Sequence, residues 1–211
     1  MTILNLMLRG GVLMYILVLI SIAALAIIIE KYRSFQATRK SNEKLRISLA
    51  QQDKAENIRA VLRIHGQSSP LGLMLDRLYN AHTSDDSLIQ QSMESTANIA
   101  IHRLEKGMGW LSTFAAIAPL IGFLGTVTGM VKVFMNIQGQ NQNSVDISLL
   151  AGGIWEALLT TIGGLVVGIL TIVFYNDLVQ NLENIAKEMQ NNAIEHMLRH
   201  QKTKNKDSRT A

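Results

Sequence analysis

An all-α membrane protein with three transmembrane helices is the fold that this sequence predicts. The 211-residue chain is 48% apolar and only 17% charged, whereas soluble domains carry roughly 25% charged residues. Its apolar residues are concentrated in three long runs, which together contain a single charged residue. The rest of the sequence has the polar composition of soluble helices. Each run is long enough to cross the roughly 30 Å hydrocarbon core of a bilayer as a helix.

The first run, residues 11–29, contains no charged residue and predicts the first transmembrane helix. It is too long for the apolar core of a signal peptide and is followed at once by charged residues, so we expect it to be retained. The second predicted span is 108–131, which is uncharged from Gly109 to Val131. A helical stripe of apolar residues over 86–106 leads into this span, so the two are expected to form one long helix.

The third predicted span, residues 147–175, contains a single charged residue, Glu156. After it, apolar residues recur every three or four positions and predict a helix over 176–200 that continues beyond the membrane. The second and third transmembrane helices are therefore both expected to extend past the bilayer. Residues 201–211 are polar and lack periodicity, and we expect them to form a disordered tail.

Residues 30–107 separate the first two spans and hold most of the polar sequence. Their apolar residues recur at helical spacing in short stretches, with a break expected from Ser68 to Pro70. Eighteen of the 20 Lys and Arg residues lie in this segment or after the third span. The positive-inside rule therefore places both segments in the cytoplasm, and residues 1–10 and 132–146 on the outer side. The basic excess is explained by membrane orientation, so we expect no nucleic-acid partner.

Glu156 requires an explanation, because a carboxylate inside a span costs a few kcal/mol. One interpretation is that Glu156 lies close to the outer interface and is hydrated. The other is that it faces a bundle interior or a water-filled lumen, where it can bind and release a proton or coordinate a cation. Three threonines as a group favour the interpretation that Glu156 faces a bundle interior or lumen: Thr160 and Thr161 on the same span, and Thr126 on the second span. Taken singly, each threonine is more often structural, because its hydroxyl can bond to its own helix.

Small residues form seams along the second and third spans, a pattern typical of closely packed membrane helices. The expected packing residues are Gly122, Gly125 and Gly129 in the second span and Gly163, Gly164 and Gly168 in the third. Together with the long apolar stripes, these seams predict that copies of the chain assemble into a ring.

Enzyme chemistry finds little support in the sequence. The chain has no cysteine, no phosphate-binding P-loop and no GxSxG nucleophile motif. His196 and His200 share a helix face, but no third ligand accompanies them, so we expect a solvated helix face and not a metal site. The sequence therefore predicts a protein that is not an enzyme and that needs neither a metal nor a cofactor.

Two stretches of the spans are distinctive: AIAPLIGFLGTVTGMVKVF from Ala116 to Phe134, and AGGIWEALLTTIGGLVVGI from Ala151 to Ile169. Both resemble the second and third spans of the MotA/TolQ/ExbB proton-channel family, most closely its ExbB/TolQ branch. The resemblance implies a homopentamer in the inner membrane of a Gram-negative bacterium. It further implies that the ring surrounds a dimer of a single-span ExbD- or TolR-like protein, with the N-terminus periplasmic and the C-terminus cytoplasmic.

By position, the resemblance assigns Glu156 to the family's third-span carboxylate, Thr161 to the hydroxyl five residues later and Thr126 to the second-span hydroxyl. With Thr160, these residues form the predicted ion pathway, and the partner is expected to supply an aspartate. The implied function is a proton-channel subunit of an ExbB/ExbD-type motor that powers TonB-dependent import across the outer membrane. The alternatives are a TolQ-type subunit of the Tol-Pal system acting on a TolA-like protein, and a scaffold without ion conduction. Sodium stays open as an alternative to protons.

Overall fold

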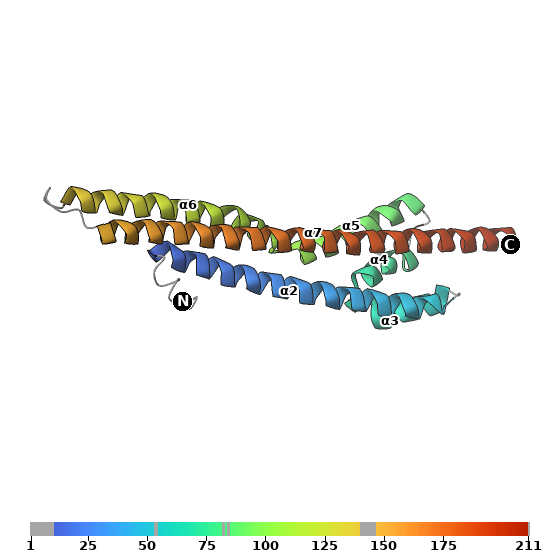
Figure 1. The fold of residues 1–211 in the computed structure, drawn as a ribbon. Helices are drawn as coiled ribbons and strands as arrows, with labels where there is room; N and C mark the ends of the chain where they lie inside the picture. Colours follow the sequence, from blue (N-terminus) through green and yellow to red (C-terminus); the bar gives the residue numbers. More distant parts are fainter. Residues whose placement is uncertain (1–10, 53–54, 82, 84, 140–146, 211) are drawn as a thin grey trace. The chain divides into compact units, whose positions relative to one another are not determined.

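The computed structural model describes residues 11–52, 55–81, 83, 85–139 and 147–210 (Figure 1). Within these ranges the chain is helical and contains no strand. Three helices are long and apolar enough to cross a membrane: α2 (Gly11–Ala50), α6 (Met108–Gly139) and α7 (Ile147–Thr210). The predicted all-α membrane fold with three spans is therefore confirmed.

The chain divides into two compact units, which we name by composition. The membrane unit comprises residues 1–29 and 107–177, and the polar unit comprises residues 30–106 and 178–211. Helices α2 and α7 contribute to both units, because each continues as a helix beyond the end of its apolar run. The predicted N-terminal segment 1–10 lies outside the described residues.

Within the membrane unit, α6 and α7 approach each other along the predicted glycine seam. A Cβ atom added to Gly122 would lie 3.0 Å from the carbonyl oxygen of Thr160 and 3.2 Å from Cα of Gly164. A Cβ on Gly164 would lie 2.8 Å from Cα of Gly122. These neighbours are backbone atoms that cannot rotate away, so only residues without side chains allow the two helices to come this close.

The other predicted packing glycines face neighbouring side chains of the same unit. Gly168 packs against the ring of Pro119, and a Cβ added to it would lie 2.7 Å from Cγ of that proline. Gly163 faces α2, where Sδ of Met14 would lie 3.2 Å from an added Cβ. The remaining two, Gly125 and Gly129, lie on α6 against Thr160 and Ala157 of α7.

The predicted uninterrupted helix from residue 86 through the second span is wrong. Helix α5 (Asp86–Glu105) ends at a cap formed by Lys106, whose backbone N–H donates to the carbonyl of His102 at 3.0 Å. Gly107 follows with φ +93°, a left-handed conformation that breaks the helical hydrogen-bond pattern, and α6 then begins at Met108. Glycine just after a helix end is a common stop signal, because it adopts positive φ without steric cost.

Two predicted boundaries also differ from the structure. Helix α7 continues to Thr210, so the tail predicted to be disordered over 201–211 is helical as far as it is described. That segment contains neither proline nor glycine, the two residues that most disfavour a helix interior, so nothing in its sequence ends the helix even without an apolar stripe. At the other end, α6 continues to Gly139, so the predicted connection 132–146 begins as helix; residues 140–146 lie outside the described residues.

The polar unit adds four short elements to the ends of α2 and α7: α3 (Ala55–His65), the 3-10 turn η1 (Gly66–Ser68), α4 (Pro70–Tyr79) and α5. The break predicted from Ser68 to Pro70 is confirmed. Ser69 caps α4 by accepting a hydrogen bond from the N–H of Gly72 at 3.3 Å, and Pro70 occupies the first turn. Asn42 of α2 accepts a hydrogen bond from the Ser69 hydroxyl at 2.7 Å, which fixes the cap against α2.

The expectation that His196 lies on a solvated helix face is wrong, because its side chain is buried in the polar unit and only 7% exposed. Its Nδ1 atom lies 3.0 Å from the hydroxyl of Tyr79 on α4, and the ring of His200 also packs edge-on against Tyr79. Burial lowers the pKa of His196 below its ordinary value of 6.5; the charge of Arg199 acts in the same direction and that of Glu195 opposes it.

The polar unit is therefore expected to lose stability in mild acid. A histidine whose pKa is lowered in the folded state takes up a proton more readily when the protein is unfolded. Its contribution to the free energy of unfolding is therefore fully present above pH 6.5, and it is lost as the pH falls through the lowered pKa of the folded state. We expect the melting temperature to fall from about pH 7.5 to about pH 5.5, and His196→Gln to reduce that fall. The matched control is His102→Gln, because the side chain of His102 is 85% exposed. An equal effect of both substitutions on the melting temperature would contradict the role of His196 in the acid sensitivity.

Candidate functional site

The site forms around Glu156, which lies on α7 within the membrane unit. Its side chain is 28% exposed, and its Oε1 atom lies 3.0 Å from Nζ of Lys132 on α6, a side chain that is 60% exposed. The carboxylate is therefore not isolated within the span but is ion-paired with a lysine of the neighbouring helix. A charged group within a span is costly unless it is paired or hydrated, and the lysine provides the pairing.

The beginning of α2 lies against the same carboxylate. Gly11, the first residue of that helix, has φ +66°, and a Cβ atom added to it would overlap Oε1 of Glu156. A larger residue would be strained in this conformation and would collide with the carboxylate. Glu156 thus lies where three helices of the membrane unit meet.

The two threonines that follow Glu156 point toward α6. Thr160 is 2% exposed, and its hydroxyl donates to the carbonyl of Glu156 at 2.8 Å and to that of Ala157 at 2.9 Å. The hydroxyl of Thr161 donates to the carbonyl of Gly122 on α6 at 2.8 Å, and so joins the two helices. The structure therefore places both residues at the junction of α6 and α7, one turn from the carboxylate.

Thr126 occupies a different environment. Its hydroxyl donates to the carbonyl of Phe123 in its own helix at 2.7 Å, at an exposed position. This bond matches the structural interpretation of a single membrane threonine. Of the predicted pathway hydroxyls, Thr160 and Thr161 are packed between α6 and α7, and Thr126 is turned toward its own backbone.

Lys132 belongs to the site but is not among the pathway residues predicted from the sequence. It begins segment 132–146, which the positive-inside rule places on the outer side of the membrane. Its spacing contains the missing signal: Lys132 follows Gly125 by seven residues and Gly129 by three, so it shares the helix face that packs against α7. A lysine on a packing face needs a nearby anion, and Glu156 is the carboxylate on the facing span.

Thr161→Val is expected to destabilise the membrane unit by about 1 kcal/mol, the usual net contribution of one hydrogen bond, because it removes the bond between α6 and α7. Thr126→Val removes a bond within one helix and should have a smaller effect. Thermal unfolding in detergent measures both, and Thr161→Ser should recover the wild-type value. Equal destabilisation by the two valine variants would show that the bond between helices adds nothing.

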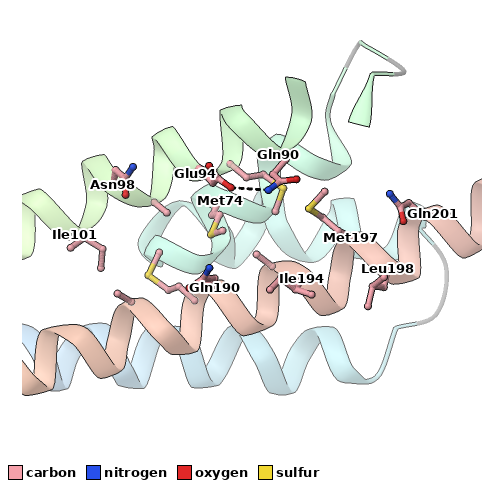
Figure 2. A pocket seen from close by; sticks show the side chains of 15 residues that line it. Met74, Gln90, Glu94, Asn98, Ile101, Gln190, Ile194, Met197, Leu198 and Gln201 are labelled. Carbon is pink, nitrogen blue, oxygen red and sulfur yellow. Dashed lines mark hydrogen bonds between the residues drawn. The ribbon is translucent and has the colours of Figure 1, made fainter. Parts of the chain in front are cut away.

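A separate groove lies in the polar unit between α5 and α7, and Met74 of α4 also contributes to its lining (Figure 2). Its volume is about 610 Å³, and methionine and amide side chains line much of it. Gln90 donates a hydrogen bond to Glu94 at 2.9 Å along one side. The groove contains none of the predicted pathway residues, so it is not part of the candidate site.

Comparison with known proteins supports a membrane role for this arrangement. Residues 36–191 match the family described as the MotA/TolQ/ExbB proton channel family. The match includes all of α6 and the part of α7 that carries Glu156, Thr160 and Thr161.

Individual relatives agree with the family match. A biopolymer transport protein ExbB of Neisseria gonorrhoeae is 30% identical over 189 residues, which cover 85% of this chain and 84% of the relative. A putative ExbB-like biopolymer transport protein of Synechocystis is 33% identical over 179 residues, covering 82% of this chain and 68% of the relative. A Tol-Pal system protein TolQ of Haemophilus influenzae is 34% identical over 101 residues, covering 48% of this chain and 43% of the relative.

Proposed function

The chain belongs to the MotA/TolQ/ExbB proton channel family, and from that premise we propose that it is the proton-conducting subunit of an energy-transducing motor. The observation that carries the proposal is Glu156, a titratable carboxylate on an apolar helix, at the meeting point of three helices and one turn from Thr160. A carboxylate kept at such a position despite its cost is expected to have a function.

The motor consists of a homopentameric ring of this chain around a dimer of a single-span ExbD- or TolR-like partner. The ring lies in the bacterial inner membrane with its N-terminus in the periplasm and its C-terminus in the cytoplasm. The distribution of Lys and Arg supports this orientation, with 18 of 20 on one side of the three spans. The close packing of α6 on α7 at Gly122 and Gly164 supplies the rigid walls that a conducting ring requires.

In the proposed mechanism, protons enter from the periplasm and reach Glu156 near the outer end of α7. Protonation neutralises the carboxylate and frees Lys132 from its ion pair, which changes the charge presented to an aspartate of the partner. Release of the proton toward the cytoplasm restores the pair with Lys132. Repeated neutralisation drives the partner relative to the ring, and a TonB-like protein carries the resulting work to the outer membrane.

A TolQ-type role, in which the motor acts on a TolA-like protein to maintain the cell envelope, is the alternative within the same family. A scaffold without conduction is a second candidate, favoured by one specific observation: the hydroxyls of Thr126, Thr160 and Thr161 all donate to backbone carbonyls. In a scaffold these threonines would serve packing alone.

Expression of this chain with a single-span ExbD- or TolR-like protein tests the proposal. The two are expected to co-purify as one complex and to restore a strain that lacks its own motor. Restored uptake of large substrates through the outer membrane would identify the ExbB role, whereas restored resistance to detergent would identify the TolQ role. A chain that purifies without a single-span partner and restores neither property would contradict the motor function.

A further inference from the structure

We propose that Lys132 determines ion selectivity: its ammonium group occupies the position next to Glu156 that a metal cation would need, so the pathway carries protons and excludes sodium. The inference rests on the proposed function, since it concerns what passes Glu156. It assigns a specific role to a residue that lies outside the predicted pathway.

The geometry around Oε1 of Glu156 supports this exclusion. Nζ of Lys132 lies 3.0 Å from that oxygen, about the distance of a charge-assisted hydrogen bond. The backbone of Gly11 approaches the same oxygen so closely that an added Cβ would overlap it. Lysine and the start of α2 thus bracket the oxygen, and a sodium ion there would lie next to a positive charge.

Among the described residues, Glu156 has no cluster of carboxylate or imidazole ligands beside it. Hard cations are held by a shell of several oxygen ligands. Across the described ranges, no group of three or more His, Asp or Glu side chains is positioned to hold a metal ion. The hydroxyl of Thr160, one turn further along α7, is buried and donates to two backbone carbonyls of its own helix.

A proton has none of these requirements. It binds one lone pair of a carboxylate that offers about four, and it needs no ligand shell. The ion pair with Lys132 is therefore compatible with proton transfer and incompatible with sodium coordination. Removing the ammonium while keeping a side chain of similar length is expected to open the site to sodium.

The experiment reconstitutes the complex of this chain with its single-span partner into liposomes and imposes a membrane potential. An internal pH-sensitive dye reports proton flux with either sodium or the large cation N-methylglucamine outside, and radioactive sodium reports sodium entry. Wild type should conduct protons equally in both solutions and admit no sodium. In Lys132→Met, sodium should enter and should lower the proton flux below the flux measured with N-methylglucamine outside.

Two further variants complete the test. Lys132→Arg keeps a cation beside Glu156 and should still exclude sodium. Lys187→Met is the matched control, since it breaks an exposed pair with Glu183 in the polar unit (3.6 Å) and should behave as wild type. Size-exclusion chromatography of every variant confirms that the complexes are assembled.

Each outcome is decisive. Sodium entry through the wild-type complex would overturn the role of Lys132 while leaving an ion channel in place. An assembled Lys132→Met complex that admits no sodium, and whose proton flux does not change with sodium outside, would overturn it in the same way. If Lys132→Met does not assemble, Lys132→Gln takes its place under the same criteria. Absence of any ion flux in the assembled wild-type complex would instead contradict the proposed function, and the selectivity role would fall with it.

Discussion

Glu156→Gln is expected to abolish energy coupling while leaving the complex assembled. Glutamine preserves the shape of the side chain, and its amide oxygen can still accept a hydrogen bond from Lys132, which lies 3.0 Å from the carboxylate in the wild type. The amide cannot take up and release a proton in the physiological range. Folding should therefore survive, and gradient-driven work should fall to the level of a strain that lacks the protein.

Uptake or envelope integrity in a complemented strain measures this effect, and co-purification of the partner measures assembly. Glu183→Gln on the same helix is the matched control, because Glu183 makes an exposed pair with Lys187 and lies in the polar unit. A correctly assembled Glu156→Gln complex that works at the wild-type rate would exclude the ion-pathway role. The scaffold function would then be the better account.

Gly164→Ala is expected to destabilise the membrane unit, although alanine is normally the better helix former. The new methyl group would lie 2.5 Å from the carbonyl oxygen of Ala118 and 2.8 Å from Cα of Gly122, so α6 and α7 must move apart. Overpacking of this kind costs about 1–3 kcal/mol, which exceeds the roughly 0.5–1 kcal/mol that alanine gains over glycine in a helix.

Gly152→Ala on the same helix is the control for this substitution. Among the described residues, no heavy atom outside the backbone of its own helix and its two chain neighbours lies within 4 Å of a Cβ atom added to Gly152. This change should therefore keep the gain in helix propensity without a clash. Thermal unfolding of the two variants in detergent separates the effects. If Gly164→Ala melted at or above the temperature of Gly152→Ala, the close approach of α6 and α7 could not be a feature of the folded protein.

The spans could be predicted from the sequence because membrane insertion depends on composition over about 20 residues, which is visible without knowledge of packing. The positions of helix ends depend on local backbone conformation. The end of α5 depends on Gly107 adopting a positive φ. The apolar stripe of the sequence continues across this position and so gave no indication that the helix ends there. The extension of α7 to Thr210 was missed for the opposite reason. The apolar stripe ends before this segment, but the segment contains no helix-breaking residue and remains helical.

The candidate site could be predicted only in part, for a related reason. Glu156 stood out because a charge within an apolar run is rare, but its partner on α6 could not be identified from α7 alone. Lys132 lies at the end of its apolar run, where a lysine is unremarkable, and its pairing depends on how α6 packs against α7. Likewise, the burial of His196 could not be predicted, because it depends on packing against Tyr79 of α4, which lies 117 residues away in the sequence.

Proton flux through the purified complex tests the central claim most directly. Liposomes that contain the wild-type complex, with the single-span partner and an internal pH-sensitive dye, are given an inward proton gradient. The account predicts acidification by the wild type, none above empty liposomes for Glu156→Gln, and wild-type flux for Glu183→Gln. Equal acidification by the wild type and an assembled Glu156→Gln complex would contradict a proton pathway through this residue.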